Sequence, residues 1–189
     1  MSNPSLLEPK SGFLKAGDNI INFYYSAADR QHFALLLQEA QARGAGVVLA
    51  VTKDYRLLPH RTHSRGRRPD VVSLQVTPNL GATIAGIEQA ATLLLNTKRE
   101  IVVLADFNGF VSSEVLLQVE AQVNLATQDK NALVITQYDG IGFPPAAMME
   151  QFLSHTVTMV GNAFYSENHN RVPPARYLMG RKSRAAAAS

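Results

Sequence analysis

Polar side chains follow several apolar runs of the sequence, at the points where strands of a parallel sheet would end. The runs 101–105 (IVVLA) and 132–136 (ALVIT), for example, are followed closely by acids, amides and a tyrosine. In open α/β sheets, small molecules bind beyond the carboxyl ends of the strands, where such groups can hydrogen-bond to them. Asp and Asn are also common in ordinary turns, which is the alternative interpretation. The residues expected to bind a ligand are Tyr25, Asp106, Asn108, Tyr138, Asp139 and Asn162.

These residues do not complete a catalytic set. Asp106, an acid at the end of an apolar strand, resembles the magnesium-binding acid of P-loop ATPases. That chemistry also requires G-x-x-x-x-G-K-[ST], whose amides and lysine hold the phosphates. The first strand–helix junction, 25–29 (YSAAD), has no glycine or lysine, and the G-x-K-S at 180–183 lacks the upstream glycine. The chain has no cysteine and no G-x-S-x-G motif, and His60 and His63 are a weak metal signal. We therefore expect a protein that is not an enzyme and that holds no cofactor or metal ion.

Basic residues are concentrated in two segments without acids, 56–68 and 171–184. They hold ten of the eighteen Lys and Arg residues, which leaves eight basic and fifteen acidic residues, a net charge of −7, for the rest. Nine of the ten are arginine, which suits bidentate recognition of phosphate or carboxylate. The R-x-x-D at 67–70 is similar to the inhibitory cyclic-di-GMP site of diguanylate cyclases, and a solvated charged loop is the alternative. The residues expected to bind an anionic partner, a nucleic acid or a cyclic dinucleotide, are Arg61, Arg65, Arg67, Arg68, Asp70, Arg181, Lys182 and Arg184.

Strand-like runs alternate with helix-like stretches along the chain. Apolar residues recur with helical spacing in each stretch, as Leu36, Leu37 and Ala40 do in the first. This alternation predicts an α/β fold, a mostly parallel sheet of about six strands with helices on both faces, in a three-layer RecA-like or Rossmann-like arrangement. Because 101–105 and 132–136 are apolar on both faces, they are predicted to be central. The predicted strands are 20–25, 47–51, 71–76, 101–105, 132–136 and 157–160.

Local signals place the helix ends. Ser26 and Asp29 form a variant of the capping box, and Gly44 is suited to follow the helix. On the helix predicted at 113–127, Glu120 and Asn124 are four residues apart beside the apolar face. We interpret them as a solvated flank, with a buried polar pair as the alternative. The helix opened by Pro144 and Pro145 is expected to bury Met148, Met149, Phe152 and Leu153.

A length of 189 residues suits one domain with tails. We divide the chain into an N-terminal arm (1–17), an α/β domain (18–165) with a basic loop (54–70), and a basic tail (166–189). The first residues lack the pattern of a secretory signal, and no window holds the roughly 18 apolar residues of a membrane-spanning helix. We therefore expect a cytoplasmic protein without membrane insertion.

Several segments, in order, resemble the MEDS family, a methanogen and methylotroph sensory domain. Residues 17–52 resemble its opening strand, Ser-capped helix and second strand, and 100–110 resembles its central strand. Glu120, 137–139 (QYD), His155 and 162–165 (NAFY) are similar to its later motifs. The family usually has His where Asn19 stands and Glu where Asp106 stands. The resemblance covers 17–178 and implies a RecA-like sheet without a working P-loop, in a protein that senses small molecules.

The function expected from these features is that of a bacterial-type sensory module. It would bind a small ligand at the strand ends and signal by docking to a partner protein, which could be a regulator, a kinase or a second copy. The alternative is a protein that binds a nucleic acid or cyclic dinucleotide through its arginine-rich segments, and steep salt dependence would distinguish it. An enzyme of unrecognised type is a third hypothesis, for which no acid, base or nucleophile can be named.

Overall fold

The computed structural model describes residues 17–30, 32–52, 71–96, 98, 100–108, 113–160, 163–165 and 168. Strands and helices alternate along the described chain. The strands are β1 (Asn19–Tyr24), β2 (Gly46–Val51), β3 (Val71–Gln75), β4 (Ile101–Asp106), β5 (Ala132–Asp139), β6 (Val157–Val160) and β7 (Ala163–Tyr165). The helices are α1 (Ala27–Arg30), α2 (His32–Ala42), α3 (Leu80–Leu95), α4 (Ser113–Thr127) and α5 (Pro145–Ser154).

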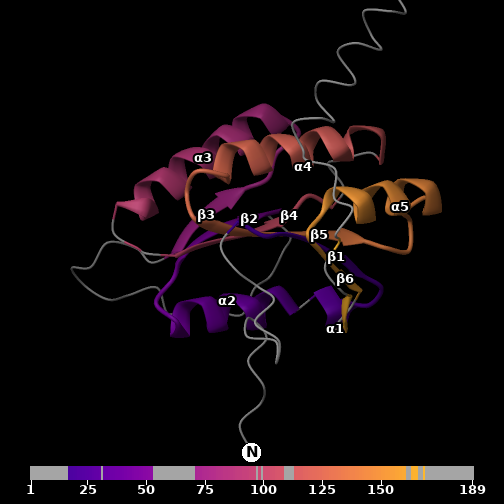
Figure 1. The fold of residues 1–189 in the computed structure, drawn as a ribbon, viewed down its shortest axis with the longest axis horizontal. Helices are drawn as coiled ribbons and strands as arrows, with labels where there is room; N and C mark the ends of the chain where they lie inside the picture. Colours follow the sequence, from indigo (N-terminus) through magenta and orange to yellow (C-terminus); the bar gives the residue numbers. More distant parts are fainter. Residues whose placement is uncertain are drawn as a thin grey trace, which may run out of the picture.

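The strands form one sheet in the order β3-β2-β4-β5-β1-β6-β7. The first six are parallel, and β7 pairs with β6 in the antiparallel direction. Helices α3, α4 and α5 cover one face, and α1 and α2 cover the other (Figure 1). The predicted three-layer α/β fold is therefore confirmed, with β4 and β5 central as expected. The short β7 was not predicted.

Each face of the sheet packs its own hydrophobic cluster. On the α1–α2 face, Leu36 and Leu37 pack with strand residues that include Leu104 and Ile135. On the opposite face, the fully buried Phe23 is surrounded by other aromatic rings, with ring centroids 5.2 Å from Phe143 and 6.1 Å from Phe152. Burying a side chain of this size stabilises the fold by about 1.5–3 kcal/mol. Side chains of one strand alternate between these two clusters, and this alternation decides on which face each polar side chain lies.

The predicted helix ends are largely confirmed. Ser26 Oγ accepts a hydrogen bond from the Asp29 N–H at 3.1 Å, and the Asp29 carboxylate accepts one from the Tyr25 N–H at 3.3 Å. Gly44 has a φ of +76°, which favours glycine after α2. Met149 was expected in the core, and this prediction is wrong because its side chain is 58% exposed. Among the described residues, no helix has the length and apolarity needed to cross a membrane.

The basic segments lie almost entirely outside the described residues. All of 53–70 falls there, and so does the tail apart from Asn168. Asn168 donates a hydrogen bond from its side chain to the Phe152 carbonyl at 2.6 Å and one from its backbone to the Thr156 carbonyl at 3.0 Å. The residues predicted to bind an anionic partner therefore stay a prediction: Arg61, Arg65, Arg67, Arg68, Asp70, Arg181, Lys182 and Arg184.

Candidate functional site

A row of three polar side chains crosses the centre of the sheet near its carboxyl edge. Asn22 of β1 lies beside Gln137 of β5, and Gln137 lies beside Asp106 of β4. Register partners in a parallel sheet point to the same face, which here is the α1–α2 face. The preceding residues on this face, including Leu104 and Ile135, belong to the hydrophobic cluster, so the sheet changes abruptly from apolar to polar. All three side chains of this polar row are completely buried.

Hydrogen bonds connect the polar row into one network. Asn22 Nδ2 donates to Gln137 Oε1 at 3.3 Å. Gln137 Nε2 in turn lies 3.5 Å from Asp106 Oδ2 and donates to the Arg30 carbonyl at 3.3 Å. Asp106 Oδ1 accepts the Asn108 N–H at 3.0 Å. A buried amide or carboxylate without such partners would be costly, so each member of the row fixes the orientation of the next.

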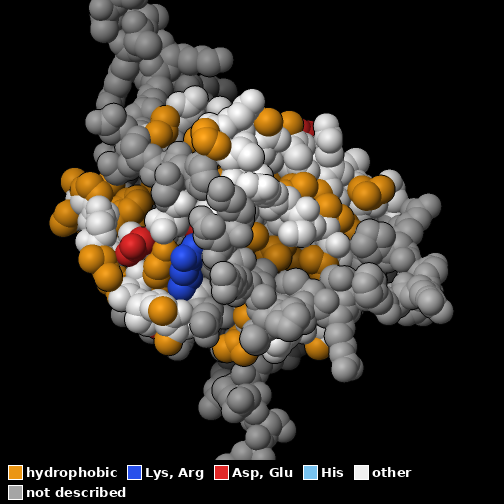
Figure 2. Space-filling model, turned by 180° about the vertical axis from the view of Figure 1, so that it is seen from behind, with side chains coloured by type: hydrophobic (Ala, Val, Ile, Leu, Met, Phe, Trp, Pro, Cys, Tyr) orange, Lys and Arg blue, Asp and Glu red, His pale blue; other side chains and the backbone are white. Residues whose placement is uncertain are grey.

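Arg30 closes the network on the solvent side. Its Nε lies 3.2 Å from Asp106 Oδ2, and its guanidinium carbon lies 5.7 Å from the centre of the Tyr24 ring. The Arg30 side chain is 31% exposed, whereas the Asp106 side chain is fully buried. The ion pair therefore runs from the interior to the surface. Figure 2 shows basic and acidic side chains next to each other at the end of the molecule where α1 and α5 lie, with hydrophobic side chains around them.

The surroundings shift the proton affinities of two groups in this network. Burial raises the pKa of the Asp106 carboxyl above its ordinary value of 3.8, and the Asn108 N–H and Arg30 only partly oppose this effect. Burial and the neighbouring Asp106 carboxylate raise the pKa of Tyr24 to about 12. Tyr24 therefore stays neutral at physiological pH. A buried acid whose pKa is raised in spite of an ion pair is typical of functional sites, because the fold holds it at a cost in stability.

Asp106→Asn is expected to flatten the pH dependence of the free energy of unfolding between pH 4 and 7. The raised pKa means that folded Asp106 binds its proton more tightly than unfolded Asp106, so its contribution to stability falls as the pH rises above about 3.8. Asparagine removes that slope, and the partly exposed Arg30 can still be solvated. Urea unfolding between pH 4 and 7 measures the difference from the parent. Asp129→Asn is the control, because Asp129 is exposed and Lys130 lowers its pKa. An Asp106→Asn variant with the same pH dependence as the parent would contradict the expectation.

The structure brings together some of the residues predicted to bind a ligand and separates others. Asp106 and Asn108 belong to the network, and Asp139 lies at the end of β5, where its Oδ1 accepts the Ile141 N–H at 2.9 Å. Tyr25 is 41% exposed, and its ring covers Gly140 so closely that a Cβ there would lie 2.6 Å from Tyr25 Cζ. Asn162 lies outside the described residues.

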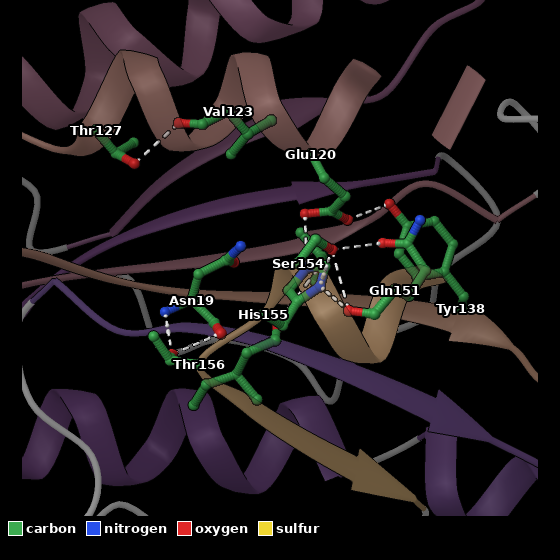
Figure 3. Close-up of polar contacts among 11 residues, drawn as sticks. Asn19, Glu120, Val123, Thr127, Tyr138, Gln151, Ser154, His155 and Thr156 are labelled. Carbon is green, nitrogen blue, oxygen red and sulfur yellow. Dashed lines mark hydrogen bonds and ion pairs between the residues drawn. The ribbon is translucent and has the colours of Figure 1, made fainter. Parts of the chain in front are cut away.

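Tyr138, which was also predicted to bind the ligand, does not lie with the other residues of that set. It is buried on the opposite face of the sheet, where its hydroxyl donates to Glu120 Oε1 at 2.5 Å. His155 Nε2 lies 3.3 Å from Glu120 Oε2, so that β5, α4 and the end of α5 meet in a second polar cluster (Figure 3). The interpretation of Glu120 as a solvated residue is wrong, because its side chain is buried and its partners are Tyr138 and His155. The sequence suggested Asn124 as a polar neighbour of Glu120 because both lie on one helix. The observed partners of Glu120 are 18 and 35 residues away in the sequence.

Three residues of the network were missed from the sequence as site residues: Asn22, Arg30 and Gln137. One signal could have found Asn22, because an amide inside the apolar run IINFYY falls on the same face as Ile20. Gln137 is adjacent to residues that were selected, and only the alternation of β5 shows that it, and not Tyr138, faces Asp106. Arg30 has no local signal, because its partner is 76 residues away.

No protein-family model matches the chain, and no curated protein matches it. Among solved structures, it is similar to the flagellar accessory protein FlaH from Methanocaldococcus jannaschii, with 12% identity over 91% of this chain and 88% of that one and a TM-score of 0.55. It is also similar to the RadB recombinase, with 16% identity over 83% of this chain and 80% of that one and a TM-score of 0.55. Both similarities concern the arrangement of the backbone.

This comparison corrects one expectation. The chain was expected not to be an enzyme because its sequence contains no recognisable catalytic set. That expectation is contradicted, since a recombinase is built on the same fold. The lack of a P-loop motif does not place the chain among non-catalytic proteins. At these identities the similarity shows the fold alone, which is a RecA-like α/β fold.

Proposed function

We propose that this protein is a sensor that binds a small molecule at the carboxyl edge of its sheet, over the polar row of Asn22, Gln137 and Asp106. The observation that carries the proposal is the buried network of this row, which interrupts an apolar sheet face at the edge where open α/β sheets bind ligands. The pKa of Asp106 is raised, and Arg30, which pairs with Asp106, is partly exposed to solvent. A purely structural role would be filled more cheaply by apolar residues.

Signal output is proposed to pass to a partner protein. The ordered motifs that resemble the MEDS sensory family support this role, although the chain has Asn19 and Asp106 where that family usually has His and Glu. The site connects to both layers of helices. Gln137 contacts α1 on one face, and the next residue, Tyr138, contacts Glu120 of α4 on the other. A ligand that moves the end of β5 would therefore act on both surfaces.

The experiment is a screen of small molecules by NMR on the intact protein, followed by a matched pair of glycine variants. Gly140→Ala places a methyl group against the Tyr25 ring and should force the ring to move, whereas Gly142→Ala adds a methyl group where nothing lies within 4 Å. We expect bound molecules to shift the resonances of Asn108 and Asp139, and Gly140→Ala to weaken binding about tenfold or more relative to Gly142→Ala, which is about 1.4 kcal/mol. Ligands that shift only residues at the amino ends of the strands would refute the proposal.

A further inference from the structure

Resting on the proposed function, we propose that the molecule recognised at this edge carries an organic cation, an ammonium or guanidinium group, which takes the place of Arg30 on Asp106 and releases α1. Arg30 is then an internal stand-in for the ligand. It shows which chemistry the surroundings of Asp106 accept, and its departure is the signal.

The surroundings of the Arg30 guanidinium are those of a site for an organic cation. A fully buried carboxylate lies 3.2 Å from Nε, and the face of the Tyr24 ring lies 5.7 Å from the guanidinium carbon. A carboxylate and an aromatic face are the two groups that proteins use to bind ammonium and guanidinium ions. Tyr24 is itself buried and neutral, so its ring face is a lasting part of the site.

Charge at this edge favours a cation over an anion. Asp139 and Asp106 both act electrostatically on Tyr24, and Asp29 of α1 lies beside Arg30 in the chain. Asp106 therefore lies against the guanidinium, and two more acids belong to this edge of the sheet. An anionic ligand that drew Arg30 away would leave Asp106 as a buried charge without its cation, which is the most costly way to break a buried ion pair. A cationic ligand keeps Asp106 paired throughout the exchange.

The donors at the site suit an organic cation better than a metal ion. Magnesium and calcium require six or more oxygen ligands, and the described part of the chain contains no group of three His, Cys, Asp or Glu side chains that could hold a metal. An ammonium group has three N–H donors and a guanidinium group five, which suits the oxygen acceptors of the Asp106 carboxylate.

Helix α1 is built to be released. It has a single turn of four residues, none of them buried, and it is followed at once by the separate helix α2. Arg30 attaches it to the sheet through the ion pair with Asp106, the hydrogen bond from Gln137 Nε2 to the Arg30 carbonyl and the contact with the Tyr24 ring. Because the Arg30 side chain is already 31% exposed, it can turn into water when another cation takes its place. Segments with few buried contacts are those that open most easily.

The test removes the internal cation and supplies it from outside. Methylguanidinium is titrated by calorimetry into the parent protein, Arg30→Ala, and the double variant Arg30→Ala/Asp106→Asn, with N-methylurea as the neutral probe of similar shape. We expect Arg30→Ala to bind methylguanidinium at least about tenfold more tightly than the parent, because the competing side chain is gone. The double variant and the urea should show no binding. Equal affinities for the parent and Arg30→Ala, or equal binding of the urea, would overturn the inference.

A second measurement on the parent protein does not depend on the folding of a variant. At saturating agmatine, which carries both a guanidinium and an ammonium group, hydrogen exchange of the α1 amides should accelerate at least about fivefold, while that of α3 stays constant. Unchanged exchange in α1 would overturn the inference. The proposed function is tested separately, because a neutral or anionic molecule that binds beside Asn108 would support that function and refute the cation.

Discussion

Replacing His155 with leucine is expected to lower the free energy of unfolding by about 3–5 kcal/mol. His155 is completely buried, and its Nε2 faces Glu120 Oε2 at 3.3 Å. Leucine has a similar size but leaves the Glu120 carboxylate inside the protein with Tyr138 as its hydrogen-bond donor. The loss comes from the carboxylate left behind, because one hydrogen bond does not replace the solvation of a charge.

His155 connects two helices through its ring nitrogens. Nδ1 is 2.8 Å from the Gln151 carbonyl, and Nε2 is 3.3 Å from Glu120 Oε2. Ser154 Oγ donates to the same carbonyl at 3.0 Å and lies 2.9 Å from Nδ1 (Figure 3). The imidazole therefore bridges α5 and α4, and leucine can reproduce neither contact.

Urea unfolding of a variant series measures this effect. The double variant Glu120→Met/His155→Leu removes both partners and should recover most of the lost stability, because an apolar pair can replace a buried ion pair at little cost. Tyr138→Phe should cost about 1–3 kcal/mol, since it removes a donor to the same carboxylate. If the double variant were as unstable as His155→Leu alone, the loss would come from packing, and the electrostatic account of the cluster would be wrong.

The fold could be predicted from the sequence because its signals are local. An inner strand of a parallel sheet is apolar on both faces, as 101–105 and 132–136 are, and this pattern needs no knowledge of distant residues. Strand β7 was missed because it has three residues and depends on pairing with β6, as between Phe164 and Met159. Met149 was misplaced because the spacing of apolar residues on α5 does not show how far the α5 face is covered.

The site could be predicted only in part, because its contacts join distant segments. The rule that ligands bind at strand ends led to Asp106 and Asn108, and both belong to the network. The rule does not say to which face a side chain points, so Tyr138 was chosen where Gln137 faces Asp106. The position of Arg30 depends on how α1 packs on the sheet, which the sequence does not state. Residues chosen by their position at a strand end must therefore be sorted by the alternation of the strand.

The polar row depends most on its central member, so Gln137→Leu is expected to lower the free energy of unfolding by about 2–3 kcal/mol. Gln137 Oε1 accepts from Asn22, and Gln137 Nε2 bonds to the Arg30 carbonyl and lies near Asp106. Leucine leaves the buried Asn22 amide without its acceptor, and the gain from its larger apolar surface offsets only part of that loss. Helix α1 also loses the hydrogen bond that Gln137 donates to the Arg30 carbonyl.

Two measurements separate this account from a general loss of packing. Urea unfolding gives the change in stability, with Gln75→Leu as the matched control, because Gln75 is an exposed glutamine on strand β3. Hydrogen exchange gives the location: the amides of α1 should exchange faster in Gln137→Leu, and those of α3 should follow only the change in global stability. A Gln137→Leu variant as stable as the parent, with α1 protected as before, would show that the row does not hold α1. In that case the ion pair with Asp106 and the contact with the Tyr24 ring would be sufficient to hold Arg30.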